Sequence, residues 1–455
     1  MDPPVTAATS IFLEAAYDGT LRRFKRCAAD LGHLLRDGIP AILENAKDDD
    51  GRRAIHHVAA GGNVQVLKYL IEEIKLDIEV EDNSGETLLN WATIEGRLAA
   101  VEYLLQMGAN PEVPNDLDCS PLHHAAMRGH TEIIPLLLSK GINVDVTNEL
   151  GSPLQYAAAH GYHDVVKVLL DHGANPNSLF HDALTPLHSS IHSQSLQCVV
   201  SLLKAGADPN LGPDGKPLTI AAEVGVIQII KLLLEAGADP NATQMHGLKS
   251  IEITAVKDNR RGVEILFPVS SPIPSYVDWS IDGIMKHVKS VKFMEKLICK
   301  AEEYFLELKS RGTSAFQRKE YSRAVYWYSE ALIKKPADAA VLSNRSLCYV
   351  YLNKGDFALE DATRCKLARP DWPKAHYRAG VALKMLNRLD DAADAFFKGL
   401  KLDPNNKELE DAFRGGFSRQ VEGHQCPTLD REGGNMPGVW IPFCGGSFLI
   451  GSVKS

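Results

Sequence analysis

The first part of the chain repeats one arrangement of apolar and polar positions, with successive copies starting 31 to 34 residues apart. Each copy has a polar residue before a Pro-Leu pair or its equivalent, then small residues and glycine, then an apolar run. Apolar residues at helical spacing mark the buried face of a helix, so each copy predicts two short helices. A fixed period of this length indicates an array of stacked repeats. The copies begin at Arg53, Thr87, Ser120, Ser152, Thr185, Lys216 and Lys249.

Residues at the ends of each copy indicate where the two helices begin and end. Ser or Thr can cap a helix N-terminus, and Pro is tolerated in the first turn. Glycine can end the first helix because it accepts a positive φ. Residues 165–170 form the apolar face of one second helix. We expect Gly173, Gly206 and Gly237 to end second helices before a β-turn finger.

The recurring wording T-P-L-H, A-A, G-H, L-L and G-A-D-P-N resembles the ankyrin repeat. About seven to eight repeats would fill residues 1–264, with degenerate first and last copies. In such repeats the fourth-position histidines, here His56, His123 and His188, hydrogen-bond the backbone between repeats. We expect no metal site at the histidines, because no Cys or carboxylate completes a set of four ligands at a suitable spacing.

A second period, of 34 residues, follows in the later part of the chain. It resembles the tetratricopeptide repeat (TPR), with three copies over about residues 305–406. The positions that carry this resemblance are Gly312, Ser346 and Gly380, then Ala324, Ala358 and Ala392, and Pro336, Pro370 and Pro404.

The order of these segments predicts the domain organisation. Residues 265–284 are rich in Pro and Ser and indicate a linker. Residues 285–416 would form the TPR domain with a lead-in helix and a capping helix, and 417–455 a disordered or divergent tail. The predicted fold is all-α, with two helical repeat solenoids. One is an ankyrin stack with β-turn fingers, and the other is a three-repeat TPR superhelix. The combination resembles a group of plant proteins, which implies a scaffold or a co-chaperone-like adaptor.

Composition and charge sharpen this picture. The chain has 455 residues and a net charge of −9, with no apolar run of the roughly 20 residues that span a bilayer. Residues 1–284 carry 21 basic against 37 acidic residues, a balance of −16, and 285–416 carry 25 against 18, a balance of +7. Eight cysteines without a C-x-x-C pair favour a reducing compartment. We therefore expect a cytoplasmic protein, with the nucleus open as a second location.

The most specific candidate site lies in the TPR segment. The resemblance implies a two-carboxylate clamp, in which basic and amide side chains hold the last Asp of an Hsp70 or Hsp90 tail. The clamp positions here are Lys309, Thr313, Asn344, Lys374 and Arg378. Lys374 and Arg378 are four residues apart, so they share one helix face and can converge on one anion.

Thr313 departs from the clamp pattern, which has Asn at this position. Thr has no amide, and losing one charge-assisted hydrogen bond of about 1.5–3 kcal/mol weakens binding roughly ten- to a hundredfold. The alternative is that these cations only solvate the surface, and that the chain is a chaperone-independent scaffold.

The ankyrin segment predicts a second protein-binding surface, because solenoids present extended concave faces. Its acidic balance favours a basic partner over nucleic acid, whose phosphates need a cationic surface. The candidate finger-tip residues are Asn83, Ser84, Asp116, Leu117, Asn148, Glu149, Asp182, Asp214 and His246.

Catalytic chemistry finds no support in the sequence. The chain has no G-x-S-x-G, P-loop, dinucleotide G-x-G-x-x-G or H-E-x-x-H motif, and we expect no enzyme activity and no cofactor. A regulatory subunit of a phosphatase or ubiquitin ligase complex remains an alternative to the adaptor. The basic stretch 21–26 is interpreted as the polar face of a capping helix, with a nuclear signal as the alternative.

Overall fold

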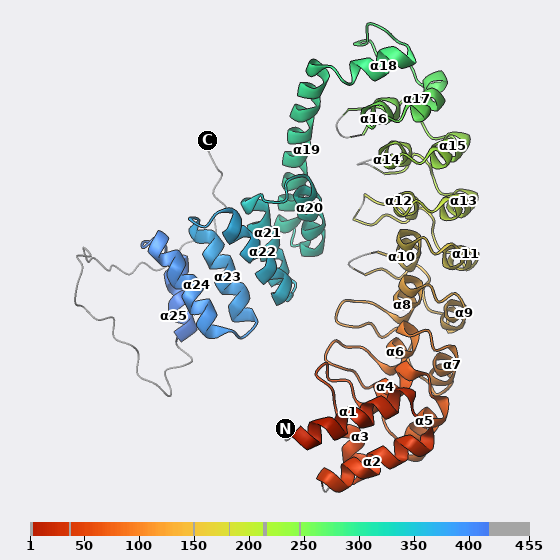
Figure 1. The fold of residues 1–455 in the computed structure, drawn as a ribbon, viewed down its shortest axis with the longest axis vertical. Coiled ribbons are helices and arrows are strands. Elements are labelled where there is room, and N and C mark those ends of the chain that lie inside the picture. Colours follow the sequence, from red (N-terminus) through yellow and green to blue (C-terminus); the bar gives the residue numbers. More distant parts are fainter. Residues whose placement is uncertain are drawn as a thin grey trace, which may run out of the picture.

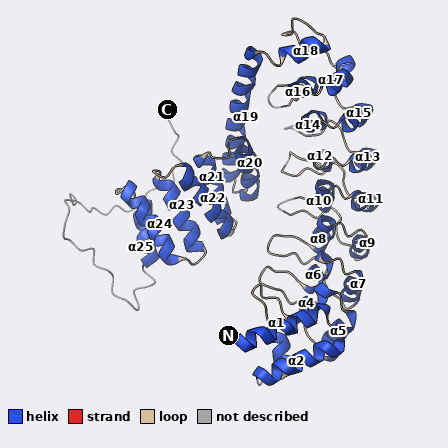
Figure 2. Ribbon diagram, in the orientation of Figure 1, coloured by secondary structure: helices blue, strands red, loops and turns tan. Residues whose placement is uncertain are grey.

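A computed structural model describes residues 3–35, 38–148, 151–181, 183–212, 216–244 and 247–417. Within these ranges the ordered elements are helices, and extended pairing is limited to four isolated β-bridges (Figure 2). Figure 1 shows a tall stack of helices that begins at the N-terminus, with a shorter array beside it. The predicted all-α fold of two repeat solenoids is confirmed. The tail predicted from residue 417 onward lies, beyond Phe417 itself, outside the described residues.

The tall stack is built from eight pairs of helices in the part of the chain that the structure describes. In each pair an inner helix is followed by an outer helix, and successive inner helices pack side by side. The inner helices are α1 (Pro3–Asp18), α4 (Ala54–Gly61), α6 (Leu88–Ile94), α8 (Pro121–Arg128), α10 (Pro153–His160), α12 (Pro186–His192), α14 (Pro217–Val224) and α16 (Ser250–Val256).

The outer helices pack behind them. They are α2 (Leu21–Leu35), α5 (Val64–Lys68) with the π-helical turn η1 (Tyr69–Glu73), α7 (Leu98–Gln106), α9 (Ile133–Leu138), α11 (His163–Asp171), α13 (Leu196–Lys204), α15 (Ile227–Glu235) and α17 (Arg260–Leu266). A short helix, α3 (Ile39–Asn45), lies between the first two pairs.

Small residues and glycine set the geometry of the stack. Ala125 and Ala157 on the inner helices are fully buried, so neighbouring repeats approach closely. Gly129 caps α8 with φ 80° and Gly161 caps α10 with φ 71°, which is the left-handed conformation expected at these positions. The same periodic residues therefore end the helices and allow them to stack.

Two of the fourth-position histidines join neighbouring repeats, as predicted. In His56, Nδ1 accepts from the Arg53 backbone N–H at 3.0 Å, so the proton lies on Nε2, which donates to the Val80 carbonyl at 3.1 Å. His123 Nδ1 likewise accepts from the Ser120 N–H at 3.2 Å, and Nε2 donates to the Gly151 carbonyl at 3.3 Å. Burial lowers the pKa of both His56 and His123 to about 4.

This arrangement predicts that acid destabilises the ankyrin stack. A His held neutral in the folded state contributes stability that is complete above its ordinary pKa of 6.5 and is lost as the pH falls toward 4. Between about pH 7.5 and about pH 5 we expect a loss of about 2 kcal/mol from each of His56 and His123. Urea unfolding of the full chain across this range should show the loss. His123→Gln should reduce the pH dependence, and an unchanged dependence in that variant would contradict the assignment.

The segment expected to be a linker packs onto the last ankyrin repeat. Tyr276 and Ile284 are buried in the ankyrin core, and the Tyr276 hydroxyl donates to Glu252 Oε1 at 2.9 Å. The expected linker therefore covers the end of the stack with Tyr276 and Ile284, on apolar surface that a further repeat would otherwise bury.

The prediction of a single helix leading into the first TPR is wrong, because two helices occupy that stretch. They are α18 (Ile281–His287) and α19 (Val291–Gln317). The helix is interrupted between them because the Ser290 hydroxyl caps the start of α19, accepting a hydrogen bond from the Phe293 N–H at 3.3 Å. The remaining helices of the shorter array are α20 (Tyr321–Lys334), α21 (Ala339–Tyr351), α22 (Gly355–Ala368), α23 (Pro373–Met385), α24 (Leu389–Leu402) and α25 (Lys407–Phe417).

Beyond the junction where the N-terminal end of α19 packs on the end of the stack, the described TPR helices also touch the ankyrin finger that precedes α12. Figure 1 shows α20 beside the finger that precedes α12. The Tyr326 ring of α20 lies 5.6 Å from the Phe180 ring and 4.9 Å from the His181 ring, between centroids, and Ala183 is buried in the apolar cluster of the TPR array. We call these residues the inter-array contact. The Tyr326 ring contacts Trp327 within its own helix, 4.8 Å away between centroids, and reaches the other array as well.

Membrane insertion has no candidate here, since none of the helices within residues 3–417 that the structure describes combines the length and apolar character of a bilayer span.

Candidate functional site

The candidate site lies on the first helices of the three TPR repeats, which are the C-terminal half of α19, α21 and α23. Gly312 and Gly380 let each first helix approach its second helix closely. A Cβ at Gly312 would lie 2.6 Å from the Tyr328 ring, and one at Gly380 would collide with the Phe396 ring. The small eighth-position residues therefore fix the spacing on which the clamp positions depend.

Lys374 and Arg378 lie one turn apart on α23. Arg378 is only 8% exposed, and its Nε donates to the Ser343 carbonyl of α21 at 3.2 Å. Burial lowers the pKa of Arg378, and burial together with the Arg378 charge lowers the pKa of Lys374. Among the residues that the structure describes, neither cation has an ion-pair partner, although Glu408 of α25 partly offsets their repulsion. Arg378 is a buried cation, and Lys374, whose side chain is exposed, adds a second positive charge one turn away. Two close cations without a counter-ion among the described residues form a site that suits an anion.

Arg345, whose side chain is 14% exposed, is a second arginine of this array and has a purely structural role. Arg345 of α21 forms a bidentate pair with Asp361 of α22, with both N···O distances at 2.7 Å, and its third nitrogen donates to the Ser329 hydroxyl at 2.8 Å. Burial alone would lower the pKa of Arg345, but Asp361 raises it on balance. Arg345 thus joins three helices, whereas Arg378 has no acid to satisfy it.

Lys309 is positioned on α19 beside the start of α21. Its Nζ lies 3.6 Å from Asp338 Oδ1, and Asp338 also caps α21 by accepting from the Val341 N–H at 2.8 Å. An incoming carboxylate would therefore share Lys309 with Asp338.

Thr313 and Asn344 are linked through Tyr328 of α20. The Thr313 hydroxyl donates to the Lys309 carbonyl at 3.0 Å, so its single proton is used. The Tyr328 hydroxyl, 3.1 Å away, then donates to Thr313 and accepts from Asn344 Nδ2 at 3.4 Å. Burial raises the pKa of Tyr328 to about 12, which keeps the phenol protonated. Contacts thus link Lys309, Thr313 and Asn344 through Tyr328, while Arg378 reaches α21 at the Ser343 carbonyl and Lys374 lies beside Arg378. Thr313 offers no donor to a ligand.

The described finger-tip residues differ in their hydrogen bonds and in their exposure to solvent. The Asn83 N–H donates to the Asp50 carbonyl and the Asp116 N–H donates to the Ser84 carbonyl, both at 3.0 Å, so these tips form a ladder between fingers. Leu117 is half exposed, and Asn148 Nδ2 donates inward to Tyr156 at 3.1 Å. The other predicted tips lie outside the described residues, and these are Glu149, Asp182, Asp214 and His246.

Metal and thiol chemistry gain no support from the described ranges. No group of three or more His, Cys, Asp or Glu side chains in them could hold a metal ion. Cys348 and Cys365 are fully buried, and burial raises the pKa of the Cys348 thiol to about 12 and that of Cys365 to about 11. Both are packing residues rather than reactive thiols.

Family models match both arrays. A model for ankyrin repeats matches residues 14–115, 108–180 and 175–244, which together span just over half of the chain. A model described as the TPR repeats of proteins similar to the serine/threonine-protein kinase BSK1 matches residues 286–379. Both repeat classes bind other proteins, so the chain has the construction of a protein-interaction scaffold.

The chain is also similar to curated proteins over a limited part of its length. It is 40% identical over 105 residues to an Hsp70-Hsp90 organising protein of Plasmodium falciparum, which covers 23% of this chain and 42% of that protein. It is 37% identical over 131 residues to the heat shock protein sti1 homolog of Schizosaccharomyces pombe, covering 29% and 21%. The chain therefore spans less than half the length of these relatives. Among solved structures, the human ASB11 ankyrin repeat domain matches with a TM-score of 0.45 and 25% identity, over 49% of this chain and all of that domain.

Proposed function

The chain belongs to the ankyrin repeat proteins and carries a TPR array, and on this basis we propose that it is a co-chaperone-like adaptor. In this proposal the TPR array binds the acidic C-terminal tail of Hsp70 or Hsp90, and the ankyrin array holds a client protein. The observation that carries the proposal is the pair formed by buried Arg378 and exposed Lys374, which lie one helical turn apart and have no ion-pair partner among the described residues. The similarity to Hsp70-Hsp90 organising proteins supports the same class of ligand. The proposal places the chain in the cytoplasm.

The proposed recognition uses the terminal Asp of the tail, which offers two carboxylates. Arg378 would hold one of them through its fixed fork of donors, and Lys374 would follow as a mobile point charge. Lys309 would bind the other carboxylate by exchanging its contact with Asp338, and Asn344 would turn its amide from Tyr328 to the ligand.

Calorimetric titration of the full chain with an Hsp90 C-terminal tail peptide tests this function. Binding is expected for the peptide with a free terminal carboxylate. The same peptide with a C-terminal amide should bind at least about tenfold more weakly, because it lacks one charge-assisted contact. Equal binding of the two peptides, or no binding of either, would refute the clamp.

A chaperone-independent scaffold is the second candidate, and two contacts favour it. Asp338 already neutralises Lys309, and Thr313 has its only donor engaged. Purification from lysate that recovers protein partners but neither Hsp70 nor Hsp90 would support this candidate over the first.

Replacing Thr313 with Asn should tighten tail binding about tenfold, because the new amide supplies the donor that the Thr hydroxyl has already used. The measurement is the same titration. Thr313→Val is the matched control and should bind the tail about as well as the unmodified chain. A strong loss in the Val variant would show that the Thr313 hydroxyl itself contacts the tail.

A further inference from the structure

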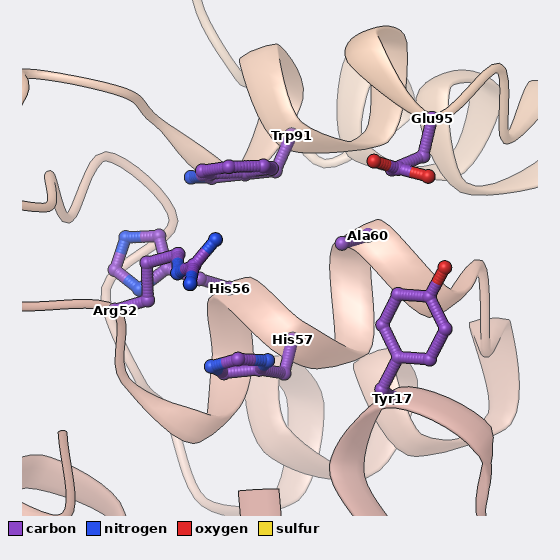
Figure 3. Close-up of a pocket in the computed structure, with 7 residues that line it drawn as sticks. All are labelled: Tyr17, Arg52, His56, His57, Ala60, Trp91 and Glu95. Carbon is purple, nitrogen blue, oxygen red and sulfur yellow. The ribbon is translucent and has the colours of Figure 1, made fainter. Parts of the chain in front are cut away.

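A small pocket opens on the ankyrin array between α4 and α6, with α1 at its side. Its volume is about 80 Å³, well below the roughly 300–1,000 Å³ of pockets for whole small molecules. It therefore suits the end of one side chain. The residues that line it include Tyr17, Arg52, His57, Ala60, Trp91 and Glu95 (Figure 3).

Two flat rings form opposite walls of this pocket. Figure 3 shows Trp91 and His57 edge-on across the gap, with the head of Arg52 between them at one end and Tyr17 and Glu95 toward the other. Trp91 Nε1 donates to Asp82 Oδ2 at 2.9 Å, and His57 Nε2 lies 3.1 Å from Asp48 Oδ2. Burial lowers the pKa of His57, so this ring is neutral at neutral pH. Both walls are thus held in place by carboxylates outside the gap.

The charges around the pocket leave one carboxylate without a counter-ion. Arg52 is neutralised by Asp48 at 2.6 Å and Asp50 at 2.9 Å, and its guanidinium lies 5.0 Å from the centre of the Trp91 ring. Glu95 is exposed at the opposite end, and within the described ranges its carboxylate has no hydrogen-bond or ion-pair partner.

We propose that this pocket receives the arginine side chain of a protein partner, with the guanidinium stacked between Trp91 and His57 and hydrogen-bonded to Glu95. A guanidinium is planar, stacks on aromatic faces and pairs with carboxylates. Arg52 on Trp91 and Arg97 on Tyr17, at 5.9 Å from the ring centre, show that these rings accept guanidinium groups within the chain. Arg52 occupies one end of the gap, so the incoming guanidinium would take the end that faces Glu95. The acidic balance of −16 over residues 1–284 attracts a basic partner to this surface.

This inference rests on the part of the proposed function that makes the ankyrin array a protein-binding surface. The TPR positions take no part in it. A failure of the pocket test leaves the tail titration unaffected, and the reverse also holds.

Saturation-transfer NMR on the full chain tests the proposal with blocked Gly-Arg-Gly, Gly-citrulline-Gly and Gly-Lys-Gly peptides. Citrulline keeps the shape of arginine and removes its charge, so the comparison measures how much the guanidinium charge contributes to binding. The arginine peptide should bind saturably and the citrulline peptide about tenfold more weakly or not at all. The lysine peptide should bind more weakly than arginine, since its ammonium cannot stack as a plane.

Variants of the chain complete the test. Glu95→Gln should weaken arginine binding about tenfold, and Trp91→Ala should do the same. Glu102→Gln removes an exposed charge from α7 of the same repeat and should leave binding unchanged. Glu95 is exposed, so its variant keeps the fold and remains informative even if Trp91→Ala unfolds the repeat. Equal binding of arginine and citrulline, or unchanged binding in Glu95→Gln, would overturn the proposal, and equal binding of lysine would overturn the choice of arginine.

Discussion

Replacing both Lys374 and Arg378 with alanine is expected to weaken binding of an Hsp90 tail peptide by at least about a hundredfold. Each cation supplies a charge-assisted hydrogen bond of about 1.5–3 kcal/mol to the terminal carboxylates, which is about ten- to a hundredfold in affinity. Neither side chain leaves an unpaired acid behind among the described residues, but Arg378→Ala removes the bond to the Ser343 carbonyl, so urea unfolding of the variant must show an intact TPR array before its binding is compared. Calorimetry with the full chain measures the effect.

A matched control separates the site from the general charge of the domain. Lys384 and Lys398 are exposed on α23 and α24, and their replacement by alanine removes the same two positive charges. That variant should keep its affinity within about threefold, because exposed charges act weakly through water and salt. A similar loss in both double variants would mean that the tail is attracted only by net charge.

Asp361→Asn is expected to destabilise the TPR array by about 3–5 kcal/mol, because it leaves the Arg345 charge buried without a partner. Asp361 is 1% exposed and holds Arg345 through two bonds of 2.7 Å, so no water replaces the lost carboxylate charge. Urea unfolding of the full chain, with hydrogen exchange of peptides from α21 and α22, locates the loss in this array.

The same helix provides the control for this prediction. Glu360 is exposed next to Asp361, and Glu360→Gln should change the stability by less than about 0.5 kcal/mol. An apolar pair, Arg345→Met with Asp361→Leu, should recover much of the stability, because buried ion pairs are often replaceable as a unit. If Asp361→Asn proved as mild as Glu360→Gln, the buried pair would not support the array.

The architecture was predictable from periodicity because each repeat buries the same positions against its neighbours. The Pro-Leu and paired-Ala positions, Gly129 and Gly161, and the fourth-position His56 and His123 all lie where the ankyrin pattern places them. Periodicity did not reveal the break at Ser290, because one serine in an otherwise helical stretch decides it by capping the next helix. It also did not reveal that Tyr276 and Ile284 of the expected linker are buried.

The sequence predicted which helices carry the candidate clamp residues, but not how far each side chain is buried or which hydrogen bonds it makes. The sequence places Lys374 and Arg378 on one helix face, and the structure adds that Arg378 is buried. The bonds from Thr313 to the Lys309 carbonyl and to Tyr328 depend on side-chain direction across two helices, which spacing does not encode. The proposed arginine pocket was missed because His57 and Trp91 occupy the same variable position of two consecutive ankyrin copies, and the repeat pattern does not specify the residue at that position.

The inter-array contact limits how the chain can change in length. Most solenoids gain or lose a repeat freely, because each repeat touches only its neighbours. Here α19 turns back along the stack and brings Tyr326 to the finger that holds Phe180 and His181. Inserting or deleting one unit between that finger and α18 would bring Tyr326 to a different finger. The number of repeats between Phe180 and α18 must therefore stay constant for Tyr326 to meet this finger. The number of repeats before Phe180 can vary without disturbing the inter-array contact.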